Sequence, residues 1–225
     1  TARSLNATGA VLALLQEALM PNLVQTLEGT PAFVHGGPFA NIAHGCNSVL
    51  ATRMAMHTAD WTITEAGFGF DLGAEKFFDI KLRSAKLDTA AVVLVATIRA
   101  LKMHGGKRSK AALAEPDPAA VERGLPNLDK HIENIGHFGE PPIVAINRFG
   151  TDTDEEIEVV RRRCAELGVP FAVSDHFARG GEGAMELARA VIEHAEQKSD
   201  PYTPLYDDGD TVMEKICKVS KKMYG

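Results

Sequence analysis

The chain lacks the excess of basic residues that a nucleic-acid-coating protein needs. Its 225 residues carry 24 Lys and Arg against 30 Asp and Glu, a formal charge of -6 at pH 7. Because phosphate binding on that scale needs a basic face, we expect no nucleic-acid partner. Long apolar runs are also missing. The longest one, AAVVLVATI from Ala90, is far too short to span a bilayer, so we expect no membrane partner.

Cysteine is scarce, and the three cysteines form no CxxC pair. Cys46, Cys164 and Cys217 are an odd number of widely spaced thiols, which predicts reduced cysteines and a cytoplasmic protein. The histidines do not cluster with cysteine at ligand spacing, so a zinc site is not expected. No targeting segment is visible. The chain begins at Thr1 without a methionine, and we expect it to be a piece of something longer.

Two motifs that would define a catalytic class are absent. There is no G-x-x-x-x-G-K-[ST] run of a P-loop nucleotide-binding protein, so any bound phosphates need their main cradle elsewhere. There is also no G-x-S-x-G or comparable nucleophile motif. The 45% hydrophobic content is still enough to bury a core, in one large domain or two small ones.

The residues that are present alternate between helical and strand patterns. In the first hundred residues the patterns predict helices at 7–28, 40–59 and 74–85 and strands at 31–35, 60–66 and 89–98. This β-α-β-α-β order predicts parallel, buried strands. The composition then changes to Gly, Pro and charge over 102–126, which predicts a linker or domain boundary.

A second set of helices and strands follows this segment. We expect helices at 127–139, from Asp154 onward, at 184–197 and at 212–224, with strands at 141–149 and 170–174. The predicted fold class is therefore α/β. It has two parts, residues 1–101 and residues 102–225.

A stretch rich in glycine and histidine follows the expected strand at 31–35. It reads HGGPFANIAHGCN from residue 35 to residue 47, and in a parallel sheet the ligand crevice lies beyond the carboxyl end of a strand. Gly36 and Gly37 would let the backbone approach a ligand closely. The helix expected next would offer unpaired N–H groups to an anion, for which a phosphate or acyl phosphate is the natural choice.

Polar side chains in the same stretch could take part in chemistry. Asn41 offers an amide and is a possible helix cap, while His35 or His44 could donate to a phosphate oxygen or move a proton. The alternative is that Gly-Gly-Pro makes only a tight turn and that His44 faces the surface of a helix.

A second glycine-rich stretch, TEAGFGFDLG, begins at the end of the next expected strand. Glu65 would lie at that strand end, where a carboxylate can hold Mg2+ directly or through water. A salt bridge at a strand end is the structural alternative. In the loop DHFARGGEG, Phe177 is an aromatic residue beside glycines that could stack on a flat heterocycle, or it could be a core residue at a strand end.

Long motifs link this chain to a known enzyme family. The run from Ala7 to Arg83 closely resembles formate-tetrahydrofolate ligase, also called formyltetrahydrofolate synthetase. The later segments ALKMHGG, NLDKHIENIGHFG, AINRFGTDT and ARGGEGAMELA resemble the same family. The resemblance implies that formate is joined to N10 of tetrahydrofolate at the expense of ATP, through formyl phosphate, with Mg2+ and a monovalent cation as possible further ligands.

The resemblance also assigns roles to residues. It implies that the stretch around Gly37, Pro38 and Phe39 lies beside formyl phosphate and folate, with Phe39 near the pterin. In the family an aromatic pair sandwiches a flat ring. Phe177 matches one position of the pair, and Leu125 stands at the other in place of an aromatic residue.

The family comparison further implies that the chain is a central fragment without the P-loop. It would hold the second half of a P-loop-NTPase-like nucleotide domain, followed by a folate-side α/β domain. The full-length parent is expected to be a homo-oligomer, and we expect the isolated chain to be inactive. The alternative is a non-catalytic folate- or nucleotide-binding scaffold that keeps the pocket without the ATPase half.

Overall fold

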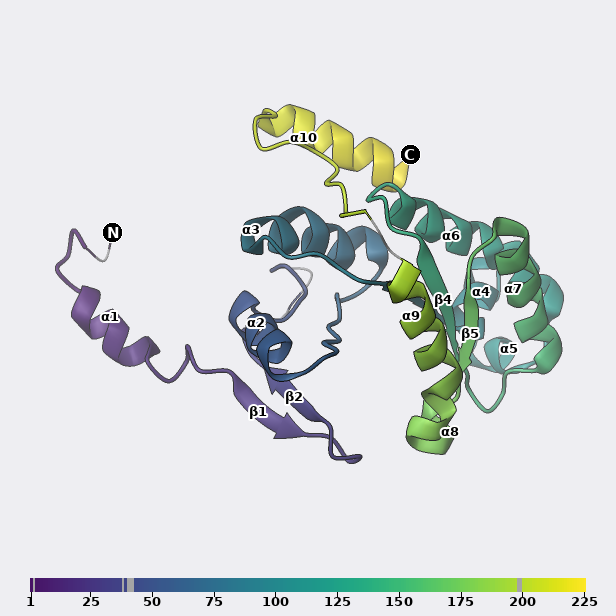
Figure 1. The fold of residues 1–225 in the computed structure, drawn as a ribbon. Coiled ribbons are helices and arrows are strands. Elements are labelled where there is room, and N and C mark those ends of the chain that lie inside the picture. The colour runs from purple at the N-terminus through teal and green to yellow at the C-terminus, as the bar shows by residue number, and fades with distance from the viewer. Residues whose placement is uncertain (2, 38, 40–42, 198–199) are drawn as a thin grey trace. The chain divides into compact units, whose positions relative to one another are not determined.

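A computed structural model describes residues 1, 3–37, 39, 43–197 and 200–225 of the chain (Figure 1). These residues form two compact units, Thr1–Ala85 and Lys86–Gly225, and each is described by itself. The division by compactness falls before the segment 102–126, where the composition predicts a boundary.

The first unit contains short helices and one two-stranded sheet. Its elements are α1 (Thr8–Leu15), β1 (Asn22–Gln25), β2 (Pro31–Val34), α2 (Val49–Thr58), the π-helical turns η1 (Phe70–Ala74) and η2 (Phe77–Leu82), and α3 (Arg83–Ala85). The helical segment expected at 74–85 is thus confirmed, although most of it is wound as π-helix.

Three expectations for this unit are wrong: the full length of the helix over 7–28, the strand over 60–66, and the parallel, buried pairing of the strand at 31–35. The helix expected over 7–28 ends at Leu15, and β1 pairs antiparallel with β2, with Asn22 opposite Val34. Pro21 cannot donate the backbone hydrogen bond that a continuing helix needs, and Gly29 turns the chain back with a φ of 83°. The residues 60–66 form no strand beyond one isolated bridge between Cys46 and Ala66.

The helix expected over 40–59 starts later than its sequence pattern indicates. Its first residue is Val49, and Ser48 caps it by accepting a hydrogen bond from the Ala51 amide at 3.0 Å. Serine is a favoured cap because its hydroxyl satisfies an otherwise unpaired N–H of the first turn. Asn41, the cap suggested by the sequence, lies outside the described residues.

The second unit is built on a parallel sheet. Its elements are β3 (Val92–Ala96), α4 (Ile98–His104), α5 (Lys110–Ala114), α6 (Pro118–Gly136), β4 (Pro142–Asn147), α7 (Asp154–Leu167), β5 (Phe171–Ser174), α8 (His176–Arg179), the 3-10 turn η3 (Gly180–Ala184), α9 (Met185–Gln197), α10 (Val212–Val219) and η4 (Ser220–Tyr224). The expected strands near 89–98, 141–149 and 170–174 and the helices from Asp154, at 184–197 and at 212–224 are confirmed, whereas α4, α5, α8 and the first turns of α6 were not expected. The strand order is β3-β4-β5.

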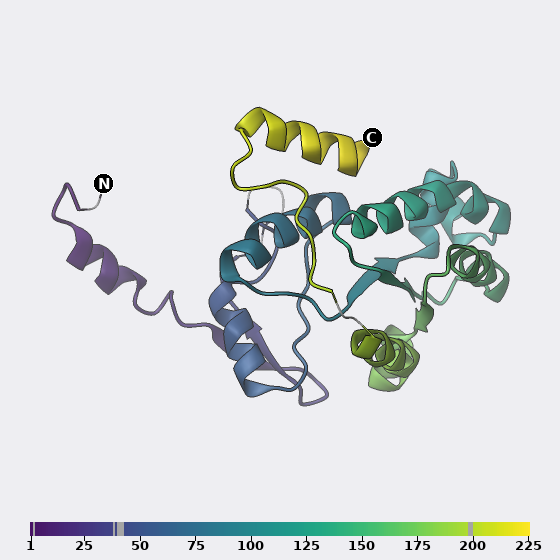
Figure 2. The same ribbon diagram turned by 45° about the horizontal axis from the view of Figure 1, so that its top comes forward.

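Helices cover both faces of this sheet. In both ribbon views the sheet lies between α6 and α9 (Figures 1 and 2). β4 is central, with Val92 opposite Pro142 and Val144 opposite Phe171, and its residues 142–146 are fully buried. Such a continuous apolar strand is typical of a parallel sheet covered on both faces. The α/β class is thereby confirmed, and the expected parallel sheet is confirmed for β3, β4 and β5 only.

The segment 102–126 is not an extended linker. It forms the end of α4, all of α5 and the start of α6, and Lys102 within it is completely buried. Asp117 caps α6 by accepting from the Ala120 amide at 2.9 Å. The proline content wrongly indicated a linker in this segment. Pro118 lies in the first turn of a helix, where a missing N–H has no cost.

Candidate functional site

The glycine-rich stretch from His35 begins directly after β2 and reaches the start of α2. Gly36 and Gly37 have φ values of 95° and 55°, which side chains with a Cβ rarely adopt. A Cβ on Gly36 would lie 3.6 Å from Cβ of Ser48, the cap of α2. The structure therefore brings the Gly36 backbone against the N-terminus of α2, although this helix begins at Val49 and not directly after the glycines. Pro38 and Asn41 lie outside the described residues.

The two histidines of the stretch differ. His35 uses both ring nitrogens within the protein, with Nε2 2.8 Å from the carbonyl oxygen of Ala18 and Nδ1 2.7 Å from the Ser48 hydroxyl. His35 is therefore built into the structure, and proton transfer by its ring would break these bonds. His44 and Phe39 are both exposed and available to a ligand.

The second glycine-rich stretch meets the end of the first. Cys46 and Ala66 form an isolated antiparallel bridge, and the Gly67 amide donates to the carbonyl of Gly45 at 2.6 Å. Glu65 precedes this bridge directly, and its side chain is exposed. The structure thus places Glu65 beside the segment that holds His44, although it does so through a bridge and not through a strand end.

The first unit also holds titratable groups that are buried or half-buried. Lys81 is only 3% exposed and donates to the Thr52 hydroxyl at 2.9 Å. Burial lowers the pKa of Lys81 and raises the pKa of the Cys46 thiol. Burial, with the adjacent carboxyl group of Asp79, also raises the pKa of Glu75 to about 7. The unit therefore holds a titratable group near neutrality close to the candidate site in sequence.

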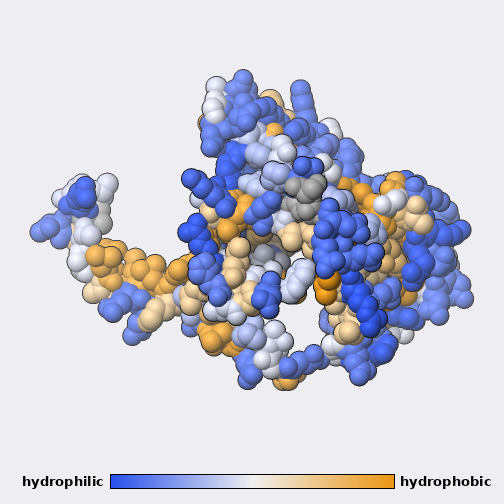
Figure 3. Space-filling model, viewed as in Figure 1, coloured by the Kyte–Doolittle hydropathy of each residue, from blue (hydrophilic) through white to orange (hydrophobic). Residues whose placement is uncertain are grey.

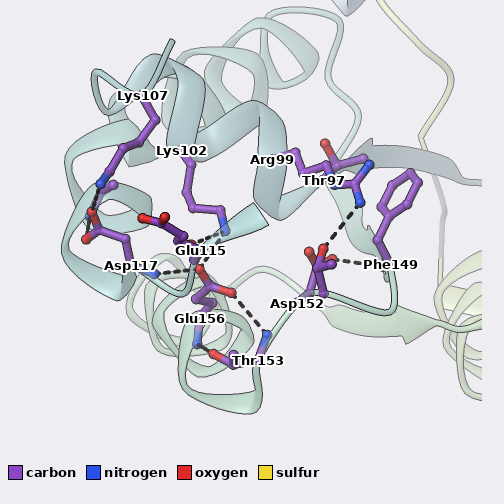
Figure 4. Close-up of polar contacts among 12 residues, drawn as sticks. Thr97, Arg99, Lys102, Lys107, Glu115, Asp117, Phe149, Asp152, Thr153 and Glu156 are labelled. Carbon is purple, nitrogen blue, oxygen red and sulfur yellow. Dashed lines mark hydrogen bonds and ion pairs between the residues drawn. The ribbon is translucent and has the colours of Figure 1, made fainter. Parts of the chain in front are cut away.

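In the second unit, polar groups gather where β3 and β4 end, which is the edge at which parallel sheets bind ligands. The Arg99 guanidinium lies 4.4 Å from the centre of the Phe149 ring and donates to the Thr151 hydroxyl at 3.2 Å. Asp152 accepts from the Phe149 amide at 2.8 Å through one oxygen (Figure 4). Its other oxygen is buried with no hydrogen-bond partner, and burial raises the pKa of Asp152.

A fully buried ion pair lies behind this edge. Lys102 Nζ is 2.8 Å from Glu156 Oε1 and also donates to the Glu115 carbonyl at 3.0 Å (Figure 4). The same carboxylate accepts from the amides of Asp117 at 2.9 Å and Thr153 at 3.0 Å. Burial alone would raise the pKa of Glu156, but these hydrogen bonds hold that pKa below its usual value. The pair joins α4 to the starts of α6 and α7.

The two expected stacking residues have different surroundings. Phe177 follows β5 in α8 and is 92% exposed, so its ring is free to meet a ligand. Leu125 lies in α6 and packs against the apolar core formed with Leu101 and Val121. Its side chain therefore supports the helix, and its place in a stacking pair stays a prediction.

Arginines also line a cavity at the same sheet edge. The cavity has a volume of about 370 Å³ and is lined by Arg148, Arg161 and Arg179 together with several carboxylates. Arg148 is paired with Asp154 at 3.0 Å. Because both arginines and carboxylates line the cavity, its charge does not by itself indicate which ligand it binds.

Sequence reasoning did not single out Arg99, Phe149 or the Lys102–Glu156 pair. The sequence did contain a local signal for Glu156. Thr153 and Glu156 have the spacing of a capping box, and the structure forms that box. The partner Lys102 lies 54 positions away from Glu156, and no local pattern reports such a pairing.

Among the residues that the structure describes, no three His, Cys, Asp or Glu side chains are placed to share a metal ion. Within the same residues, no helix combines the length and apolar character needed to cross a bilayer.

Comparison with known proteins gives one consistent result. The sequence matches the family described as formate-tetrahydrofolate ligase over residues 1–225. It is 55% identical over 226 residues to the formate-tetrahydrofolate ligase of Phocaeicola vulgatus and 54% identical over 226 residues to that of Bacteroides fragilis, covering 100% of this chain in both. With the Sphingobium sp. ligase it shares 56% identity over 223 residues, or 99% of this chain. The chain spans about 40% of the length of these relatives. On the family match over the whole chain and these identities, the chain belongs to the formate-tetrahydrofolate ligase family.

Proposed function

We propose that this chain is part of an ATP-dependent ligase that makes 10-formyltetrahydrofolate from formate and tetrahydrofolate through formyl phosphate. The observation that carries the proposal is the family match over residues 1–225. Since the chain spans about 40% of its relatives and contains no P-loop motif, we propose that the isolated chain is inactive. Residues 1–101 would belong to the nucleotide-binding domain and residues 102–225 to the folate side.

The glycine-rich stretch would hold the acyl phosphate. The positive φ values of Gly36 and Gly37 and the nearby N-terminus of α2 fit an anionic guest, because backbone N–H groups there have no helical partner. Asn41 would add a donor toward developing negative charge. His44, exposed on the same stretch, would donate to an oxygen or carry a proton.

Other residues would bind the remaining ligands. The exposed carboxylate of Glu65 fits an ion such as Mg2+, which prefers one or two carboxylates and phosphate oxygens. Phe39, which is exposed, would lie near the pterin of the folate. Phe177, also exposed, would stack on a flat ring, and Leu125 would occupy the other position of that pair in place of an aromatic residue. ATP would meet the nucleotide-binding half. A monovalent cation, a homo-oligomeric parent and a cytoplasmic location complete the proposal.

Gly37→Ala in the complete polypeptide tests the role of the stretch. The added methyl group should crowd the ligand and lower kcat/KM at least about tenfold, roughly 1.4 kcal/mol of transition-state stabilisation. Gly29→Ala is the matched control, because Gly29 also has a positive φ, 83°, but lies in the β1–β2 turn. Both variants should lose similar stability in thermal melts. Equal losses of activity in the two variants would show that the stretch only makes a tight turn.

The alternative function is a non-catalytic binding or scaffold module. The isolated chain is expected to form no 10-formyltetrahydrofolate above background from ATP, formate and tetrahydrofolate, and robust turnover would contradict the fragment proposal. A parent polypeptide that binds folate but shows no ligase activity would favour the scaffold.

A further inference from the structure

The side chain of Asn47 joins the end of β2 to the start of α2. Its Oδ1 accepts hydrogen bonds from the backbone amides of His35 and Ser48, both at 3.0 Å. Its Nδ2 donates to the carbonyl oxygen of Phe33 at 2.6 Å. One carboxamide therefore satisfies three backbone groups, two before Gly36 in the chain and one after it. The two groups before Gly36, on Phe33 and His35, lie 14 and 12 positions from Asn47 in the sequence.

His35 adds a second tie between the same two segments. Because the Ala18 carbonyl can only accept, Nε2 of His35 carries the proton and donates to it at 2.8 Å. Nδ1 is then free to accept from the Ser48 hydroxyl at 2.7 Å. That hydroxyl also accepts from the Ala51 amide as the cap of α2. The ring orientation is thus linked to the helix cap.

These ties determine where Gly36 lies. Its φ is 95°, and a Cβ there would be 3.6 Å from Ser48 Cβ and 3.9 Å from the Ser48 amide nitrogen. No regular ladder continues from Val34 to hold this turn, since β2 ends at that residue. The Asn47 carboxamide takes the place of the missing ladder bonds.

We propose that Asn47 is a positioning residue, whose carboxamide holds the backbone of Gly36 and Gly37 at the N-terminus of α2. The inference rests on the proposed function, because the position matters for catalysis only if that backbone receives the acyl phosphate. Asn47 itself need not touch the ligand. Its chemistry is specific: an aspartate can accept from His35 and Ser48 but cannot donate to Phe33, and an alanine can do neither.

The three hydrogen bonds of the Asn47 carboxamide to His35, Ser48 and Phe33 are called the clasp below. Hydrogen exchange on the 225-residue chain tests the clasp directly. In Asn47→Ala, the amides of His35 and Ser48 lose their acceptor and should exchange at least about tenfold faster, as expected when a hydrogen bond worth about 1.4 kcal/mol is removed. In Asn47→Asp, these two amides should remain near wild-type protection. Asn22→Ala is the control, because Asn22 is an exposed asparagine of β1 in the same unit.

Steady-state kinetics of the complete polypeptide tests the consequence. Asn47→Ala should lower kcat at least about tenfold, with Asn47→Asp intermediate and Asn22→Ala unchanged, since misplacing a binding group reduces rate without abolishing folding. Unchanged exchange at His35 and Ser48 in Asn47→Ala overturns the clasp, as does faster exchange spread evenly over residues 1–85.

If exchange rises locally as expected but turnover stays at the wild-type level, the link between the clasp and catalysis is overturned. If Gly37→Ala also leaves turnover unchanged, the proposed function of the stretch fails as well. If Gly37→Ala lowers turnover while Asn47→Ala does not, only the positioning role of Asn47 is lost.

Discussion

Glu75 is a residue whose surroundings make the stability of its unit depend on pH. Burial and the neighbouring Asp79 raise its pKa from 4.5 to about 7, while Lys76 opposes the shift. The folded state therefore binds a proton more tightly than the unfolded state. Between about pH 4.5 and pH 7 the free energy of unfolding should fall as pH rises, by up to about 1.4 kcal/mol per pH unit.

Trp61 provides the measurement for this prediction, because it is the only tryptophan of the chain and lies in the first unit. Urea unfolding followed by its fluorescence should show lower stability at pH 7 than at pH 5. Glu75→Gln should remove most of that difference, whereas Glu17→Gln, an exposed glutamate of the same unit, should not. A pH dependence that survives Glu75→Gln would contradict the assignment.

Glu156 and Glu158 lie on the same helix in opposite environments. Glu156 is fully buried against Lys102 at 2.8 Å, while Glu158 is 55% exposed and lies 3.4 Å from Arg161. Glu156→Gln leaves a buried ammonium without its counter-charge and should destabilise the chain by about 3–5 kcal/mol. Glu158→Gln should cost less than about 1 kcal/mol. Urea unfolding followed by circular dichroism compares the two variants. Equal losses of unfolding free energy would show that the buried ion pair stabilises the chain no more than the exposed one.

At the scale of elements, α4 and α6 approach each other through glycine. A Cβ on Gly124 of α6 would lie 2.0 Å from the carbonyl oxygen of Leu101 in α4, and one on Gly105 would lie 1.8 Å from that of Ala120. Because these neighbours are backbone atoms, they cannot turn away. The two helices can therefore pack this closely only without side chains at these positions.

Gly124→Ala should separate α4 from α6 and lower the free energy of unfolding by about 1–3 kcal/mol or more. Gly136 lies in the same helix but has nothing within 4 Å of its Cβ position. Gly136→Ala should thus be neutral or stabilising by about 0.5–1 kcal/mol, because alanine favours a helix. Thermal melts of both variants provide the measurement. A neutral Gly124→Ala would argue against the close helix contact.

The elements of the parallel sheet could be predicted, whereas those of the first unit could only partly be. The runs VVLVA, PIVAIN and FAVS are short, apolar and β-branched, and each forms a strand. The stretch from Thr8 to Glu28 is apolar too, but its periodicity does not show where a helix stops and a hairpin starts. That hairpin depends on cross-strand pairing and on the turn at Gly29.

At the scale of the whole chain, the N-terminal segment leaves a large apolar surface uncovered. α1 has no buried residue, and Leu12, Leu14 and Leu19 are all exposed. Figure 3 shows hydrophobic side chains gathered along this segment. Exposed apolar patches of this kind favour association.

The isolated chain should therefore self-associate as its concentration rises. Replacing Leu12 and Leu14 by glutamate should shift it toward the monomer in size-exclusion chromatography with light scattering. Gln16→Glu, which adds one charge to the same exposed segment, is the control and should have little effect. Association that persists unchanged in the double variant would place the contact elsewhere on the molecule.

Part of the candidate site could also be foreseen from the sequence. The glycines after PAFV predicted a stretch of backbone without side chains, and Gly36 and Gly37 have the positive φ values that favour glycine. The sequence could not show that His35 is engaged by Ala18 and Ser48, or that Glu65 reaches the stretch through a bridge at Ala66. These facts depend on partners far along the chain.

The sequence by itself determined the family, the strands of the parallel sheet and the helices that begin at Asp154, Met185 and Val212. Family motifs, β-branched runs and capping residues such as Thr153 are all local signals that act over a few positions. Only the tertiary structure decided that Lys102 pairs with Glu156, that Leu125 packs against the core, and that Asn47 ties β2 to α2. The physical reason is that burial and long-range hydrogen bonds arise between segments distant in sequence, whereas local patterns report only how each segment prefers to fold.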